Sequence, residues 1–309
     1  MFFRITSFIV FLLIISRALE GPIDSLLILI DDANEQEQFD LWTQVGLHYR
    51  EAGNFDSANI AFHQAEKYIA NEVQKGNYLH NLGSLNWRFG KYEKAEQWYD
   101  SAITIREKTH DTAGVMKSRY YLTLVYRDLS QYDKAANLIR SLIQLSLAQK
   151  DSASLADMYN HLGGIFLRLN QYDSASSWYK KAIDIRFAMN DSVKMADSYS
   201  NMGKIAREQS LYPEAVDYYK QALEIYAAIG KHKKEAYTRL LLGGTYWAAK
   251  KYQEALRQYL TSQQLYERMR NKQQVASTLK NIGLIYRDIG NIDKAVEYYI
   301  RSLELYMEI

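Results

Sequence analysis

The chain has 309 residues, and its 38 Lys and Arg residues nearly balance its 36 Asp and Glu residues, so the net charge is only +2. A charge this small argues against direct binding of nucleic acid, and the absence of cysteine excludes disulfides, thiolate metal sites and cysteine nucleophiles. With 48% hydrophobic residues, 15 glycines and only two prolines, the composition favours an all-α protein.

Residues 1–18 have the features of a secretory signal peptide. Arg4 precedes an apolar run over residues 8–15, and small residues stand at positions 16 and 18. We expect cleavage after Ala18 and an exported protein, periplasmic or otherwise extracytoplasmic. The apolar run is shorter than the roughly 20 residues that a membrane span needs, which favours a cleaved signal over the alternative of an uncleaved anchor. Without Arg4 and Arg17 the positive and negative side chains are equal in number.

Beyond this segment, three residue types recur at a fixed interval. A small residue, usually Gly, recurs after a first step of thirty-seven positions and then at every fortieth position: Gly46, Gly83, Thr123, Gly163, Gly203, Gly243 and Gly283. An alanine follows each of them at a constant offset of twelve, at Ala58, Ala95, Ala135, Ala175, Ala215, Ala255 and Ala295. A large side chain follows at a constant offset of sixteen, at Phe62, Tyr99, Ile139, Tyr179, Tyr219, Tyr259 and Tyr299.

This period predicts seven helical hairpins. The small residue of each first helix lets the second helix approach closely at its alanine, and the aromatic side chains wedge between neighbouring hairpins. Asp111, Asp151 and Asp191 are expected to cap first helices. The predicted helix pairs are 36–52 with 55–71, 74–89 with 92–108, 112–129 with 132–149, 152–169 with 172–189, 192–209 with 212–229, 232–249 with 252–269, and 272–289 with 292–309.

The two ends and the third hairpin are expected to differ from the rest. Residues 22–35 contain the apolar segment from Ile23 to Ile30, which predicts a helix that caps the first hairpin. No comparable segment follows the seventh hairpin, so its apolar side chains are expected to be uncovered. Thr123 replaces Gly and Leu142 replaces a small residue, which predicts irregular packing in the third hairpin.

Leu82-Gly83, Tyr92, Ala95, Tyr99 and Ala102 have the spacing of the tetratricopeptide repeat signature. The chain resembles that family over residues 36–309. The resemblance implies an all-α fold, a right-handed solenoid or superhelix of about seven helix-turn-helix repeats. The period of forty positions is longer than the family's usual length of about 34 residues, which suggests longer helices, and the family's helix-ending proline is absent.

No arrangement of residues predicts catalysis. None of the six histidines lies four residues from another, so no helical metal-binding pair exists. Gly90-Lys91 lacks the following Ser or Thr of a phosphate-binding loop, and Gly163-Gly164 and Gly243-Gly244 lie at helix-packing positions. We therefore expect that the protein is not an enzyme and needs no cofactor or metal.

The candidate binding surface is the concave groove that the resemblance implies along the first helices. The family's groove positions lie two residues before the recurring small residue and one, four and five residues after it. The first of these positions holds Gln44, Asn81, His161, Asn201 and Asn281. A side-chain amide both donates to and accepts from a peptide backbone, so a row of Asn predicts a grip on an extended chain. The alternative is that these are exposed polar residues or residues that stabilise loops through hydrogen bonds.

Six arginines and two tryptophans occupy the later groove positions. The arginines are Arg50, Arg88, Arg127, Arg168, Arg207 and Arg287. A row of guanidinium groups selects carboxylates on a ligand, but an acidic residue directly follows four of them, so local ion pairing is the alternative. Trp87 and Trp247 are expected to be exposed and to contact a partner.

Together these features predict a protein–protein interaction scaffold that binds a peptide or protein segment in the groove. The alternative is the ligand-sensing N-terminal region of a longer signal-transduction protein, a sensor kinase or transcriptional regulator, because the array is similar to the sensor regions of bacterial envelope signalling proteins. The uncapped last hairpin further predicts a membrane-linked protein or self-association through that end.

Overall fold

The computed structural model describes residues 21–309, in which all regular secondary structure is α-helical. A short helix, α2 (Pro22–Asp31), precedes seven consecutive helical hairpins, which confirms the predicted all-α repeat solenoid. The predicted signal peptide, residues 1–18, lies outside the described residues. The described residues divide into two compact units, which we call unit 1 (residues 21–145) and unit 2 (residues 146–309), with the division inside α8.

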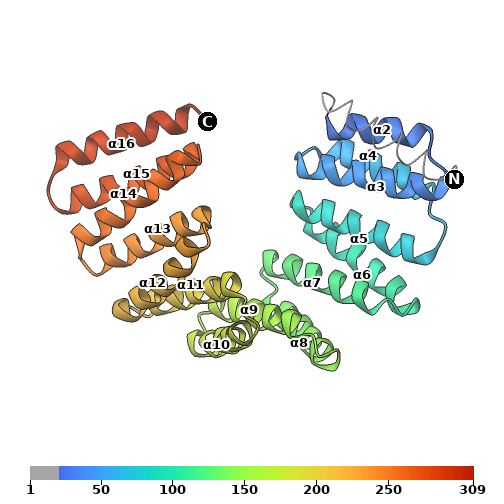
Figure 1. Cartoon of the computed structure of the whole chain (residues 1–309), viewed down its shortest axis with the longest axis horizontal. Coiled ribbons are helices and arrows are strands. Elements are labelled where there is room, and N and C mark those ends of the chain that lie inside the picture. The colour runs from blue at the N-terminus through green and yellow to red at the C-terminus, as the bar shows by residue number, and fades with distance from the viewer. Residues whose placement is uncertain (1–20) are drawn as a thin grey trace. The chain divides into compact units, whose positions relative to one another are not determined.

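Unit 1 contains α2, two complete hairpins and most of a third (Figure 1). Its hairpins are α3 (Glu35–Glu51) with α4 (Phe55–Glu66), α5 (Glu72–Arg88) with α6 (Tyr92–Lys108), and α7 (Thr112–Asp128) with α8 (Tyr132–Ala148). Unit 2 contains four hairpins stacked in chain order. They are α9 (Ser152–Arg168) with α10 (Tyr172–Ala188), α11 (Ser192–Glu208) with α12 (Tyr212–Ala228), α13 (His232–Ala248) with α14 (Tyr252–Arg268), and α15 (Lys272–Asp288) with α16 (Ile292–Met307).

The helix ends follow from local sequence. The first helix of the second hairpin ends at Arg88, and in the turn that follows Gly90 has a φ of 72°, in the left-handed region, while Lys91 N donates to Asn86 O over 2.9 Å. The same turn recurs in the sixth hairpin with Lys250 at φ 57°. At the other end of the hairpins, the side chains of Asp111, Asp151 and Asp191 accept from backbone amides three residues later, as predicted for N-caps.

The recurring glycine makes room for the aromatic ring of its own hairpin. A Cβ atom built on Gly203 would lie 2.8 Å from the ring of Tyr219, closer than a real Cβ contact allows. The same ring also lies in a buried cluster with Leu241 and Leu242 of the next hairpin. The aromatic ring therefore packs between hairpins as expected, and the glycine of its own hairpin leaves the space that the ring fills.

The first helix of the third hairpin accommodates Thr123 without a break, and the irregular packing of that hairpin stays a prediction. Thr123 is buried, and its hydroxyl donates to Tyr120 O over 2.6 Å, so the residue is accommodated within a helix of the same length as α5. A helix shorter than predicted lies in the first hairpin, where α4 ends at Glu66 rather than near residue 71. Asn71 then caps α5 by accepting from Gln74 N.

The first and last helices differ in how well their apolar sides are covered. α2 packs against α3, and Ile30 joins a buried cluster with Val45 and Ala61. On α16, Val296 is 48% exposed, whereas Leu256 at the equivalent position of α14 is 8% exposed. Leu303 and Tyr306 of α16 are also exposed.

Candidate functional site

The predicted groove residues lie on the first helices of the hairpins, whose shared surface we call the first-helix face. Within unit 1, α3 contacts α5 and α5 contacts α7; within unit 2, α9 contacts α11 and α11 contacts α13. Successive first helices therefore form one continuous face in each unit, which can present side chains from several repeats to a single ligand.

Most of the predicted arginine row is paired with acids. Arg50, Arg127, Arg207 and Arg287 each form an ion pair of 2.7 to 2.9 Å with the acidic residue that directly follows them, namely Glu51, Asp128, Glu208 and Asp288. Arg88 lies 3.2 Å from Glu51 as well. Arg168 is exposed and is the one member of the row without an ion pair in the described part of the chain. The alternative of local pairing is thus the one observed.

The two tryptophans are half-buried rather than exposed, which corrects the sequence-based expectation. The indole N–H of Trp87 donates to Asp128 over 2.9 Å, and that of Trp247 donates to Asp288 over 2.7 Å. Each acceptor lies on the first helix of the next repeat and is also paired with an arginine. The tryptophans therefore link consecutive repeats.

The acceptors of these indoles were missed by sequence reasoning. The interval from Trp87 to Asp128 equals the interval from Trp247 to Asp288, and this repetition was the available signal. In unit 2 the pKa of Asp288 lies below its usual value, first because it accepts a hydrogen bond from Arg287 and second because it accepts one from Trp247. Asp288 is therefore ionised at neutral pH.

The row of amides is less uniform than predicted. Gln44 is exposed, Asn81 and His161 are half-buried, and Asn201 accepts a weak hydrogen bond of 3.4 Å from Lys204. Asn281 lines a pocket in the first-helix face of unit 2. Asn281 lines this cavity together with other predicted residues.

This cavity, which we call the groove pocket, has a volume of about 510 Å³. It brings together three predicted residues, Arg207, Trp247 and Asn281, from α11, α13 and α15. Residues that sequence reasoning did not select also line it, among them Glu208, Leu240, Gly244 and Tyr259. Its volume falls within the range of about 300–1,000 Å³ that small ligands and side chains occupy.

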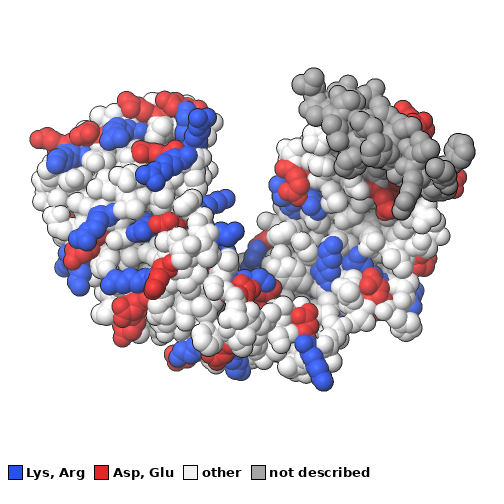
Figure 2. All heavy atoms as spheres, in the orientation of Figure 1, with Lys and Arg blue, Asp and Glu red and all other residues white. Residues whose placement is uncertain are grey.

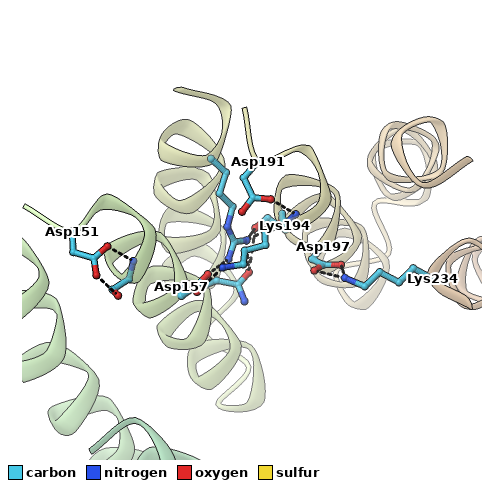
Figure 3. A network of polar contacts seen from close by, with 10 residues as sticks. Asp151, Asp157, Asp191, Lys194, Asp197 and Lys234 are labelled. Atoms are coloured by element: carbon cyan, nitrogen blue, oxygen red, sulfur yellow. Dashed lines mark hydrogen bonds and ion pairs between the residues drawn. The ribbon is translucent and has the colours of Figure 1, made fainter. Parts of the chain in front are cut away.

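A second polar network, also missed by sequence reasoning, connects the hairpins of unit 2 (Figure 3). Arg186, only 4% exposed, donates to Asp157 over 2.9 Å, and Lys194 of the next repeat donates to the same carboxylate over 2.8 Å. One repeat further on, Lys234 donates to Asp197 over 2.7 Å. The two lysines lie at the same distance along the chain from their acids, so the pairs repeat with the hairpins.

The face of unit 2 seen in Figure 2 carries charged side chains of both signs. In the view of Figure 2, Lys and Arg side chains of unit 2 are interspersed with Asp and Glu. Among residues 21–309, no group of three or more metal-ligating side chains is placed to hold an ion. Within the same range, no helix has both the length and the hydrophobicity required to cross a membrane.

Family comparison identifies the repeat. A model described as tetratricopeptide repeat matches residues 37–108, 194–268 and 240–308, and a second model of that description matches residues 156–188. The chain belongs to the tetratricopeptide repeat family. This fold is typical of non-catalytic scaffolds for protein interaction. None of the curated proteins compared with this tetratricopeptide repeat chain matches it.

Solved structures share the fold at low sequence identity. The apo form of RapI is similar with a TM-score of 0.65 and 14% identity, covering 87% of this chain and 97% of its own. A signal-transduction ATPase of Pyrococcus horikoshii with a tetratricopeptide repeat sensor has a TM-score of 0.74 and 16% identity, covering 93% of this chain and 44% of its own. The Rap conjugation gene regulator of plasmid pLS20, in complex with the Phr* peptide, has a TM-score of 0.57 and 16% identity, covering 87% and 74%.

Proposed function

We propose that this tetratricopeptide repeat protein binds an extended segment of a peptide or partner protein on its first-helix face. The observation that carries the proposal is the groove pocket, where Arg207, Trp247 and Asn281 come from three consecutive repeats and line one cavity. A ligand that contacts all three would cross the repeats rather than occupy a single hairpin. The structural similarity to a Rap regulator in complex with a peptide supports this choice of ligand class.

The polar groups of the pocket suit a peptide backbone. Asn281 supplies both a donor and an acceptor, and Arg207 supplies further donors. Because Glu208 pairs with Arg207 at 2.8 Å, the pocket carries no net charge from its lining residues. A peptide amide, which is polar but uncharged, fits this environment better than an isolated charge does.

A random-sequence peptide display library tests the proposal. The full chain is immobilised, peptides that it retains are isolated, and their affinities are measured by fluorescence polarisation. The double variant Asn201→Ala plus Asn281→Ala is expected to weaken binding of the retained peptides at least tenfold, and Gln221→Ala, at an exposed amide on the second helix α12 of unit 2, serves as the control. Retention of no peptide, or equal binding by the double variant, would count against peptide binding at this face.

Two wider proposals concern where the chain acts and whether it senses its ligand. We propose that the chain acts outside the cytoplasm, because residues 1–18 have the pattern of an export signal. Fractionation of cells that carry the full chain tests this, since recovery in the cytoplasm would oppose it. The chain also resembles a signalling ATPase with a repeat sensor in fold, so a ligand-sensing role is the second candidate, and a measured change in repeat geometry on peptide binding would favour it.

A further inference from the structure

Gly244 lines the groove pocket, and because glycine has no side chain the pocket is open at this position. Gly244 follows the packing glycine Gly243, and a Cβ atom built on it would lie 3.3 Å from the hydroxyl of Tyr259 and 3.7 Å from Nη1 of Arg207. At the equivalent position of the preceding repeat stands Lys204, which has a long side chain. Gly244 therefore leaves both donor groups accessible from the pocket.

The Tyr259 hydroxyl has no hydrogen-bond partner among residues 21–309. The residue is only 3% exposed, yet it lines the groove pocket. Burial raises the pKa of Tyr259 to about 12, so the hydroxyl keeps its proton at neutral pH and can donate it. An unpartnered polar group in this position leaves a hydrogen bond unmade unless a ligand or water supplies the acceptor.

Arg207 presents a second donor to the same space. Its Nη2 is occupied by Glu208 at 2.8 Å, whereas Nη1, the atom nearest to Gly244, makes no hydrogen bond within the described chain. The Tyr259 hydroxyl and Arg207 Nη1 are thus two donors without an acceptor in the described chain, and a bound ligand can supply that acceptor. Because Glu208 neutralises Arg207, and these are the charged residues of the lining, a carboxylate gains no net attraction here.

Apolar groups border these donors. Leu240, Trp247 and the buried ring of Tyr259 line the pocket together with Ala248. They offer a seat for one apolar side chain, since burial of such a side chain is favourable in proportion to the apolar area removed from water. The pocket thus combines donors for a neutral acceptor with an adjoining apolar surface.

We propose that the groove pocket is an anchor subsite in which Tyr259 and Arg207 donate to one main-chain amide carbonyl of the ligand, while an aliphatic side chain next to that carbonyl packs on Leu240 and Trp247. This inference rests on the proposed peptide binding and names its anchoring residue. Gly244 is essential because a methyl group there would occupy the approach of the carbonyl to the Tyr259 hydroxyl.

A minimal probe tests the subsite without a selected peptide. N-acetyl-L-leucine methylamide carries one aliphatic side chain and two amide carbonyls, and isovalerate carries a comparable chain with a carboxylate. Binding to the full chain is followed through the indole N–H resonance of Trp247, which Trp247→Phe assigns. We expect a saturable shift with the amide and none with isovalerate at equal concentration. An unmoved resonance, or equal binding of isovalerate, overturns the proposal.

Matched variants identify the atoms that bind the probe. Tyr259→Phe deletes only the unpartnered hydroxyl and is expected to weaken the probe about fivefold, as expected for one hydrogen bond. Gly244→Ala is expected to weaken it at least as much. Tyr179→Phe and Gly164→Ala make the same changes in the fourth repeat, away from the groove pocket, and are expected to leave affinity unchanged. Unaltered affinity in Tyr259→Phe overturns the proposal, and thermal melting confirms that each variant is folded.

The peptide library separates this inference from the general function. If peptides are retained and Gly244→Ala and Tyr259→Phe bind them as the wild type does, the subsite is wrong and peptide binding elsewhere on the face stands. If no peptide is retained but the amide probe binds as described, the subsite stands and the wider peptide function is wrong.

Discussion

Trp247 and Asp288 join two consecutive repeats through one hydrogen bond, 2.7 Å from the indole nitrogen to Oδ2. Arg287 holds the same carboxylate at 2.8 Å, through Oδ1. Asp288 therefore binds the indole of the preceding repeat and the guanidinium of its own helix at the same time. A ligand that moves the Trp247 indole in the groove pocket would change the hydrogen bond to this carboxylate.

Replacement of Trp247 by Phe is expected to raise the pKa of Asp288 toward its usual value. The indole hydrogen bond stabilises the ionised carboxylate and is the second cause of its low pKa, after the bond from Arg287. Arg287→Gln should therefore raise that pKa further than Trp247→Phe does. Carboxyl-carbon NMR titration measures both, and an unchanged Asp288 pKa in either variant contradicts the geometry.

Replacement of Arg186 by Ala is expected to destabilise unit 2 by about 3 kcal/mol, because it leaves Asp157, Ser198 Oγ and Lys194 O without their buried donor. Lys194→Ala removes the other cation from Asp157, but its side chain is 44% exposed, so a loss of less than about 1 kcal/mol is expected. Urea unfolding of the two variants compares these effects. Equal losses would show that the burial of Arg186 is not what matters.

Replacement of Gly203 by Ala tests the seat of the aromatic ring. A methyl group there would meet the Tyr219 ring at 2.8 Å, so we expect destabilisation of about 1–3 kcal/mol despite the better helix propensity of Ala. At Gly164 the same change meets only the Tyr179 hydroxyl at 3.4 Å, and a neutral or slightly stabilising effect is expected. Denaturation midpoints decide, and a stabilised Gly203→Ala protein would refute this packing.

Acidification is expected to destabilise unit 1 through His80. This side chain is 4% exposed, and burial, followed by the charges of Arg106, Lys117 and Arg50, lowers its pKa to about 3. The unfolded chain, with an ordinary pKa of about 6.5, binds a proton between these values that the folded chain does not. The part of the free energy of unfolding that depends on neutral His80 is fully present above about pH 6.5 and is lost as the pH falls toward 3. The expected loss between pH 7 and pH 5 is about 2 kcal/mol.

His80→Gln should remove this pH dependence, and His110→Gln, at an exposed site, should retain it. Urea unfolding at pH 7 and pH 5 provides the measurement. A free-energy difference between His80→Gln and wild type that is identical at the two pH values would mean that His80 does not titrate as described.

The repeat fold was predictable from sequence because its determinants recur at a constant interval. Gly203 and Tyr219 hold the same relationship as Gly83 and Tyr99, so packing of one hairpin predicts that of the next. The length of α4 was not predictable in this way, since it depends on the first step, from Gly46 to Gly83, which is shorter than all the others. The hydrogen bond of the Thr123 hydroxyl within its own helix was not predictable either, because the interval shows which residue replaces Gly but not where its side chain bonds.

The candidate site was predictable in its position and less so in its chemistry. Family spacing placed Arg207, Trp247 and Asn281 on one face, where the structure gathers them. It did not reveal that Asp288 engages Trp247, because that contact crosses repeats and depends on side-chain direction. Tyr259 was assigned to the core from its spacing, and only the structure shows that its hydroxyl reaches the pocket beside Gly244.

The contact between Gly203 and Tyr219 implies that contacts within a hairpin of unit 2 and contacts between its hairpins differ in their sensitivity to salt. A ring seated against backbone resists sliding of the two helices of a hairpin, whereas the lysine–aspartate contacts between hairpins, such as Lys234 with Asp197, yield to ions in solution. The junction between these two hairpins also contains the buried contact of Tyr219 with Leu241 and Leu242. Added salt should therefore weaken only the ionic part of the junction and leave the packing of the ring against Gly203 unchanged.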